Sequence, residues 1–157
     1  MIHGVATKEL VRHKDERGFF EEIIRATDGF FSEGFAQLSR SNMITGVVKA
    51  WHIHKTQIDW WYVVRGTTKV ALFDMRKDSP TFRQLNEFVL GDNGEHIVLK
   101  IPAGVAHGLK VLHGPADLVY ITSAVYSKEE EGRIAFDDTD IGYDWVQGVP
   151  ITNKNIT

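Results

Sequence analysis

The hydrophobic positions fall into short segments rich in β-branched and aromatic residues, separated by turn residues. These segments are 19–26, 35–41, 46–54, 59–66, 68–76, 95–102, 107–112 and 117–126. Gly, Pro, Asn and Asp indicate turns at 65–68, 77–81, 91–95, 102–108 and 113–117. Helical patterns are confined to 27–34 and 127–132. Short strands at regular spacing predict an all-β sandwich or barrel rather than βαβ units.

The chain has no linker, repeat or low-complexity tract, so residues 1–157 are expected to form one β-domain. Its 157 residues can bury a self-sufficient core. From about Tyr126 onward the pattern is less regular. The acidic stretch 136–145 in that part is interpreted as a solvated loop, because it lacks the spaced oxygen ligands and closing Glu of a calcium-binding EF-hand.

Composition and charge narrow the choice of partners. The chain has 18 Lys and Arg, 21 Asp and Glu, and no cysteine, which excludes disulfides and thiolate metal sites. Without a basic run, nucleic acid is not an expected partner. No apolar run approaches the roughly 20 residues that a membrane helix needs. The N-terminal sequence lacks the pattern of a secretory signal, so the cytoplasm is the expected location.

Polar side chains stand out within the apolar stretch 46–66. His52 and His54 are two residues apart on a predicted strand, so both side chains point to the same face. Asp59 begins the next predicted strand, and a hairpin would fold its carboxylate back beside them. His107 follows a Pro-Gly turn and is expected on the opposite wall of the barrel. Burying these groups is costly unless they bind one another, a metal or a ligand.

The spacing of these residues resembles the cupin motifs. Gly46-x5-His52-x-His54-x4-Asp59-x6-Gly66 is similar to the first motif, with Asp in place of the usual Glu. "PAGVAH" is similar to the second motif, with His107 in its histidine position. In metal-binding cupins these positions are the ligands. The resemblance therefore implies a divalent transition metal, Mn, Fe, Ni or Zn, held by His52, His54, Asp59 and His107.

A second resemblance runs from Asp15 to Trp145. "DERGFFEE", "FAQLSRS", "GVVKAWH", "VVRG", "SPTF", "IPAGVAHG", "YITSAVYS" and "DDTDIGYDW" occur in the order of the landmarks of the dTDP-4-dehydrorhamnose 3,5-epimerase family. The chain is identified as a divergent member of that family, which has a cupin-like jelly-roll fold.

The family resemblance implies a reaction and a site. Members invert ring carbons beside the keto group of a nucleotide-linked 4-keto-6-deoxyhexose, by proton transfer and without an organic cofactor. His52 matches the base and Tyr120 the acid. The matching substrate-binding positions are Arg17, Phe20, Glu22, Gln37, Ser41, Lys49, His107 and Tyr126. The first three of them imply a homodimer, since family members present them across an interface by strand exchange.

The departures from the family pattern point toward a metal. Asp59 stands where the family has Lys, and His54 where it has Gln. The Asp that orients the catalytic His has its best match in Asn155. Two hypotheses remain. One is a keto-sugar epimerase or isomerase in which a metal replaces Lys as the electrophile. The other is a metal-dependent cupin acting on another small sugar or acid, or a sugar-nucleotide binder without turnover. If His52 ligates the metal, the same nitrogen cannot be the base.

Overall fold

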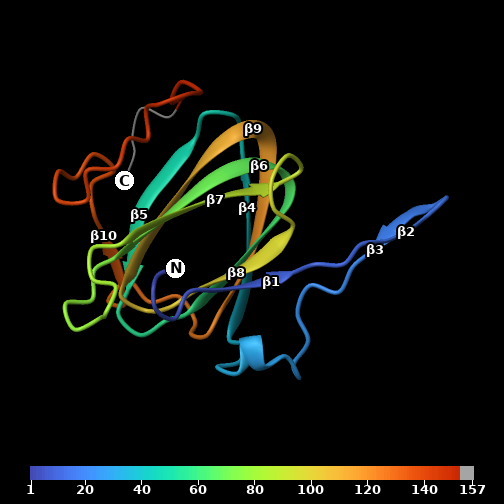
Figure 1. Cartoon of the computed structure of the whole chain (residues 1–157), viewed down its shortest axis with the longest axis horizontal. Helices are drawn as coiled ribbons and strands as arrows, with labels where there is room; N and C mark the ends of the chain where they lie inside the picture. The colour runs from blue at the N-terminus through green and yellow to red at the C-terminus, as the bar shows by residue number, and fades with distance from the viewer. Residues whose placement is uncertain (153–157) are drawn as a thin grey trace.

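The structure, a computed structural model, describes residues 1–152, and its regular secondary structure is almost wholly β-strand (Figure 1). This confirms the all-β prediction. Within residues 1–152 no helix is long and apolar enough to cross a membrane. The elements are β1 (Ala6–Glu9), β2 (His13–Asp15), β3 (Gly18–Phe20), the 3-10 helix η1 (Gly29–Phe31), β4 (Gln37–Met43), β5 (Val48–His54), β6 (Asp59–Asp74), β7 (Leu85–Gly91), β8 (Ile97–Ile101), β9 (Val105–Thr122) and β10 (Glu131–Arg133).

The sheet curls into a barrel because its two longest strands bend. β6 and β9 are antiparallel and pair from Asp59↔Thr122 to Asp74↔Val105, with register shifts between Val63 and Thr68. The sheet order is β1-β8-β6-β9-β5-β10, with β4 also pairing with β9 and β7 with β6. Each long strand therefore contributes to both halves of the sandwich (Figure 1).

The turns predicted at 65–68 and 113–117 are wrong, because β6 and β9 continue through them. The two paired strands approach each other very closely at this bend. A Cβ on Gly66, whose φ is +78°, would lie 2.7 Å from the Cα of Ala116. Glycine therefore permits a tight bend within a continuous strand at this position.

Two further predictions are corrected. Only the start of the segment 19–26 is a strand, and β2 and β3 form a separate hairpin that projects away from the barrel (Figure 1). The helix predicted at 127–132 is wrong, since a turn there leads into β10. β10 pairs with β5, with Arg133 opposite His52. Local acidic composition suggested helix, but pairing with a distant strand decides the backbone conformation.

The segment after β10 covers the outer face of the sheet. Trp51 on β5 and Trp145 are both fully buried, with ring centroids 5.0 Å apart. Lys110 on β9 is also fully buried, and its Nζ donates to the carbonyl oxygen of Trp145 at 2.6 Å. Burial lowers the pKa of Lys110. This packing attaches residues 134–147 to the barrel and so fixes β10 beside β5.

Candidate active site

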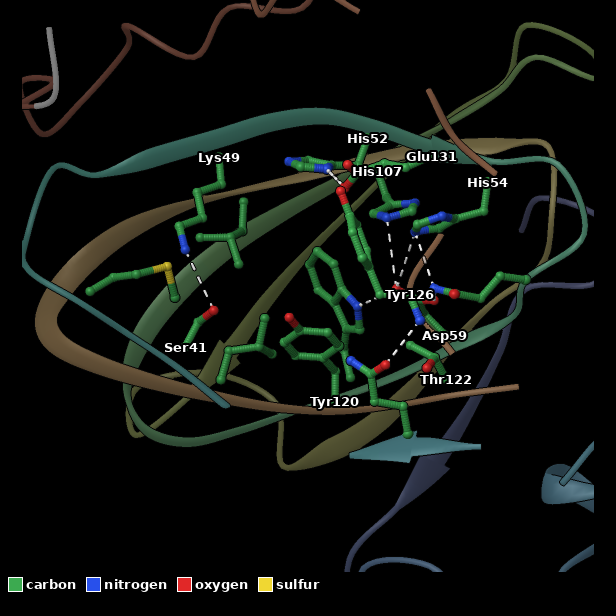
Figure 2. Close-up of a pocket in the computed structure, with 16 residues that line it drawn as sticks. Ser41, Lys49, His52, His54, Asp59, His107, Tyr120, Thr122, Tyr126 and Glu131 are labelled. Carbon is green, nitrogen blue, oxygen red and sulfur yellow. Dashed lines mark hydrogen bonds and ion pairs between the residues drawn. The ribbon is translucent and has the colours of Figure 1, made fainter. Parts of the chain in front are cut away.

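A cavity of about 170 Å³ opens inside the barrel between β4, β5, β6, β9 and β10 (Figure 2). The polarity of the cavity wall changes along each strand. On β9 the inward side chain of His107 is followed two residues later by Leu109, and on β6 Asp59 is followed by Trp61. One end of the cavity is therefore polar and the other apolar. The predicted residues that line it are Gln37, Ser41, Lys49, His52, His54, Asp59, His107, Tyr120 and Tyr126.

Three of these side chains converge at the polar end. Asp59 is 3% exposed, and its Oδ2 lies 3.8 Å from Nε2 of His54 and 3.9 Å from Nε2 of His107 (Figure 2). One ligand atom from each residue lies within 4.8 Å of the others. Asp59 does lie beside His54, as predicted, but it does not lie beside His52. The predicted hairpin is wrong, because β9 lies between β5 and β6 in the sheet. The predicted opposite wall for His107 is wrong, because β9 is the direct neighbour of β5 and pairs His107 with His52.

The hydrogen bonds around this group fix which atoms carry lone pairs. Nδ1 of His107 donates to the carbonyl oxygen of Val105 at 3.0 Å, which leaves Nε2 unprotonated in the neutral ring. Burial lowers the pKa of His107 to about 4, against the opposing charge of Asp59. Gln57 Nε2 donates to Asp59 Oδ1 at 2.7 Å and lies 3.4 Å from Nε2 of His54.

The indole of Trp61 completes the surroundings of Asp59 by donating to Oδ2 at 3.1 Å. Two imidazole nitrogens and a carboxylate thus face one point as acceptors. Within residues 1–152 no Lys or Arg forms an ion pair with Asp59. Such a donor set suits a divalent cation.

His52 is separated from this group. Its Nδ1 lies 2.9 Å from Oε1 of Glu131 on β10, and only its ring stacks beside His107, with centroids 6.3 Å apart (Figure 2). Burial alone would raise the pKa of Glu131, but the hydrogen bond from His52 and the nearby charges lower it. The four-residue ligand set predicted from the sequence is therefore divided: His54, Asp59 and His107 converge, and His52 pairs with Glu131.

Sequence reasoning missed Glu131. Strand alternation over "EEEGRI" places Glu131 on the opposite face from Glu130, but the segment 127–132 is predicted as helix. Asn155, the predicted orienting residue, lies outside the described residues.

Two tyrosines and a lysine line the open side of the cavity. Tyr120 is half-buried on β9, opposite Trp61 in the register, whereas Tyr126 is 63% exposed. The backbone N–H of Tyr126 donates to Oε1 of Gln37 at 2.9 Å. Lys49 is the one Lys or Arg among the described lining residues, and its Nζ lies 3.5 Å from Oγ of Ser41 (Figure 2).

The three N-terminal residues of the predicted site are absent from the lining of this chain's cavity. Arg17 and Phe20 belong to the β2–β3 hairpin, and Glu22 follows it (Figure 1). The side chain of Arg17 is 82% exposed and pairs with Asp15 at 2.5 Å. Glu22 pairs with Arg25.

The barrel and its lining define a cupin-like jelly roll with groups suited to proton transfer. Residues 1–156 match the family model described as dTDP-4-dehydrorhamnose 3,5-epimerase, and the chain belongs to this family.

Similar proteins agree with this assignment. Spore coat polysaccharide biosynthesis protein SpsL of Bacillus subtilis is 40% identical, with the match covering 92% of this chain and 97% of that protein. A dTDP-4-dehydrorhamnose 3,5-epimerase of Shigella flexneri is 34% identical, and the match covers 90% of this chain and 82% of that protein. The crystal structure of a dTDP-6-deoxy-D-glucose-3,5-epimerase from Legionella pneumophila, in complex with dTDP-4-keto-L-rhamnose, is 30% identical. It matches with a TM-score of 0.83 over 94% of this chain and 81% of that one.

Proposed function

We propose that the protein is an epimerase or isomerase of a nucleotide-linked 4-keto-6-deoxyhexose, in sugar or polysaccharide biosynthesis. The proposal rests on one observation: an imidazole, His52, and a phenol, Tyr120, line the same cavity in a chain of this family (Figure 2). The solved relative holding a dTDP-linked keto-sugar supports the substrate class.

The proposed reaction is proton transfer at a carbon next to the ketone. Nδ1 of His52 is engaged by Glu131, so Nε2 is the nitrogen that accepts the proton. Tyr120 reaches the cavity from the other side and returns a proton to the opposite face of the ring (Figure 2). Positioned acids and bases of this kind contribute about 10²- to 10⁴-fold each. Because the whole chemistry is proton transfer, no organic cofactor is needed.

The cavity size indicates how the substrate lies. At about 170 Å³ it is smaller than the roughly 300 Å³ at which pockets for drug-sized ligands begin, so a sugar ring enters and the nucleotide stays outside. Lys49 is the cation available to the diphosphate at the open side. As a point charge it offers less geometric selectivity than the fork of an arginine.

Solvent deuterium tests the function. The protein is incubated in heavy water with dTDP-4-keto-6-deoxyglucose, and label at the ring carbons beside the ketone is measured by mass spectrometry and NMR. We expect incorporation by the wild-type protein and a loss of at least about 10²-fold in His52→Asn and in Tyr120→Phe. Absence of label with wild-type protein, with and without added divalent metal, contradicts the proposal.

We also propose that His54, Asp59 and His107 hold a divalent transition metal, Mn, Fe, Ni or Zn. The residues fit such an ion, because all three present lone pairs to one buried point, and no ammonium from residues 1–152 occupies it. A metal bound there would polarise a carbonyl oxygen, the role that the family resemblance gives to lysine. Since His52 stands outside the ligand group, its Nε2 stays available as the base.

This ion site favours a second candidate function, a metal-dependent cupin acting on another small sugar or acid. Elemental analysis of untagged protein tests the site, and we expect about one transition metal per chain. A metal content near zero after equilibration with each of the four ions contradicts it. Metal without deuterium incorporation favours the second function. Binding of the nucleotide sugar without exchange favours a binder that has lost turnover.

A homodimer is the proposed assembly. The β2–β3 hairpin projects from the barrel (Figure 1). Phe19 and Phe20 are exposed on it, and Arg17 does not line the cavity of its own chain. Exchange of this hairpin would bring Arg17, Phe20 and Glu22 to a second copy. Light scattering should give twice the mass of one chain, and deletion of residues 12–21 should reduce the measured mass to that of one chain. A monomeric wild-type protein contradicts this assembly. The cytoplasm stays the predicted location.

A further inference from the structure

The contact between His52 and Glu131 depends on the register of two strands. β10 runs antiparallel to β5 with Glu131 directly opposite His54 and Arg133 opposite His52. In an antiparallel pair the diagonal neighbour two residues along lies on the same face and within reach of a long side chain. Glu131 uses this diagonal to place Oε1 at 2.9 Å from Nδ1 of His52 (Figure 2).

The chemistry of the two groups fixes the proton on the ring. An ionised carboxylate can only accept a hydrogen bond, so the proton of neutral His52 must be on Nδ1. Nε2 is then the lone-pair nitrogen. We propose that Glu131 is the positioning residue that holds His52 in the tautomer and orientation of a base, an inference that rests on the proposed function.

Glu131 is itself held in place. Its side chain is 14% exposed, and Arg133 Nη2 lies 3.3 Å from its second oxygen. Both backbone groups of Ile134 bond to Trp51, at 3.0 and 3.1 Å, directly beside His52. Burial of Trp145 and the bond from Lys110 secure the segment that follows. A carboxylate anchored on both sides of its strand can orient a ring without reorganising during the reaction.

The neighbouring Glu130 provides a matched control. Its carboxylate accepts hydrogen bonds from the backbone N–H of Thr56 at 3.1 Å and from its Oγ1 at 2.7 Å. It has the same charge as Glu131 and directly precedes it in the chain, but it does not line the cavity. Any effect of local charge or strand stability should therefore appear in both Glu130→Gln and Glu131→Gln.

The first measurement is the tautomer of His52 in full-length protein carrying ¹⁵N-labelled histidine, at one pH above neutrality. Loss of the signal in His52→Asn assigns it. We expect wild type and Glu130→Gln to be protonated on Nδ1. Glu131→Gln should populate both tautomers, because an amide can donate as well as accept. An unchanged single tautomer in Glu131→Gln overturns the inference.

The second measurement is the rate of deuterium exchange from the keto-sugar. Glu131→Gln should lower kcat by about 10²- to 10⁴-fold with little change in KM, as expected for a residue that acts through a base. Glu130→Gln should stay within about twofold of wild type. Formate should restore part of the activity of Glu131→Ala. Equal losses in both Gln variants, or a loss confined to KM, contradict the inference. If wild type shows no exchange, the proposed function fails, and the tautomer measurement alone decides the role of Glu131.

Discussion

Strand β6 begins and ends with a buried aspartate, and the surroundings of the two carboxylates differ sharply. Asp74 at its end is fully buried and accepts hydrogen bonds from Arg76 Nε at 2.8 Å, and from the hydroxyls of Ser79 and Thr81 at 2.6 Å each. Asp59 at its start receives only the neutral donors of Gln57 and Trp61 among the residues described.

The comparison separates a structural carboxylate, Asp74, from Asp59, the carboxylate proposed to bind a metal. Burial alone would raise the pKa of Asp74, but the donors of Arg76, Ser79 and Thr81 hold it well below its usual range. A carboxylate compensated in this way stabilises the fold and has no capacity left for a ligand. Asp59 keeps lone pairs directed at two imidazoles. A buried carboxylate that has only neutral hydrogen-bond donors and no Lys or Arg partner among the described residues is costly, and this arrangement is expected where a cation binds.

The largest expected effect is on stability. Asp74→Asn should lower the free energy of unfolding by about 2 to 4 kcal/mol, because Arg76 loses its buried partner. Asp59→Asn in metal-free protein should change it by less than about 1 kcal/mol. Urea denaturation at pH 7 followed by circular dichroism measures both. Equal losses in the two variants would mean that Asp59 is structural as well.

The second expected effect is on metal affinity. Here Asp59→Asn should have the larger effect and Asp74→Asn the smaller one. Asp59→Asn should weaken binding of Zn²⁺ by at least about tenfold, since removal of an outer-shell partner alone typically costs 10- to 100-fold. Asp74→Asn should bind as wild type does. Titration calorimetry on protein stripped with a chelator measures this. Unchanged affinity in Asp59→Asn contradicts the proposed ligand group.

The smallest expected effect is the pH dependence of the contribution that Asp74 makes to the free energy of unfolding. Its pKa is lower in the folded than in the unfolded chain, where an Asp titrates near 3.9. The stabilisation is therefore complete above the unfolded pKa and is lost as the pH falls toward the folded one. Between pH 6 and pH 3 the gap in unfolding free energy between wild type and Asp74→Asn should narrow by about 1 kcal/mol. A constant gap over this range would show that the charge of Asp74 is not what stabilises the fold.

The strand pattern and the residue motifs were readable in the sequence because both are local. Short β-rich segments at regular spacing predicted the all-β class. The spacing of His52, His54 and Asp59 predicted a converging group, of which His54 and Asp59 do converge. β7 was missed, and the glycines at the bends of β6 and β9 were taken for chain reversals. A glycine that lets two strands approach closely cannot be told from a turn glycine by the residues around it in the sequence.

The sequence by itself determined the fold class, the family landmarks and which residue types face the cavity. Only the tertiary structure decided which of those residues lie next to one another. The bond between His52 and Glu131 joins positions 79 residues apart, and the position of His107 depends on β9 lying next to β5. Pairing of distant strands is set by the packing of the whole barrel, so no local pattern encodes it. That pairing turned one predicted quartet into an imidazole with a carboxylate partner and a separate three-residue group.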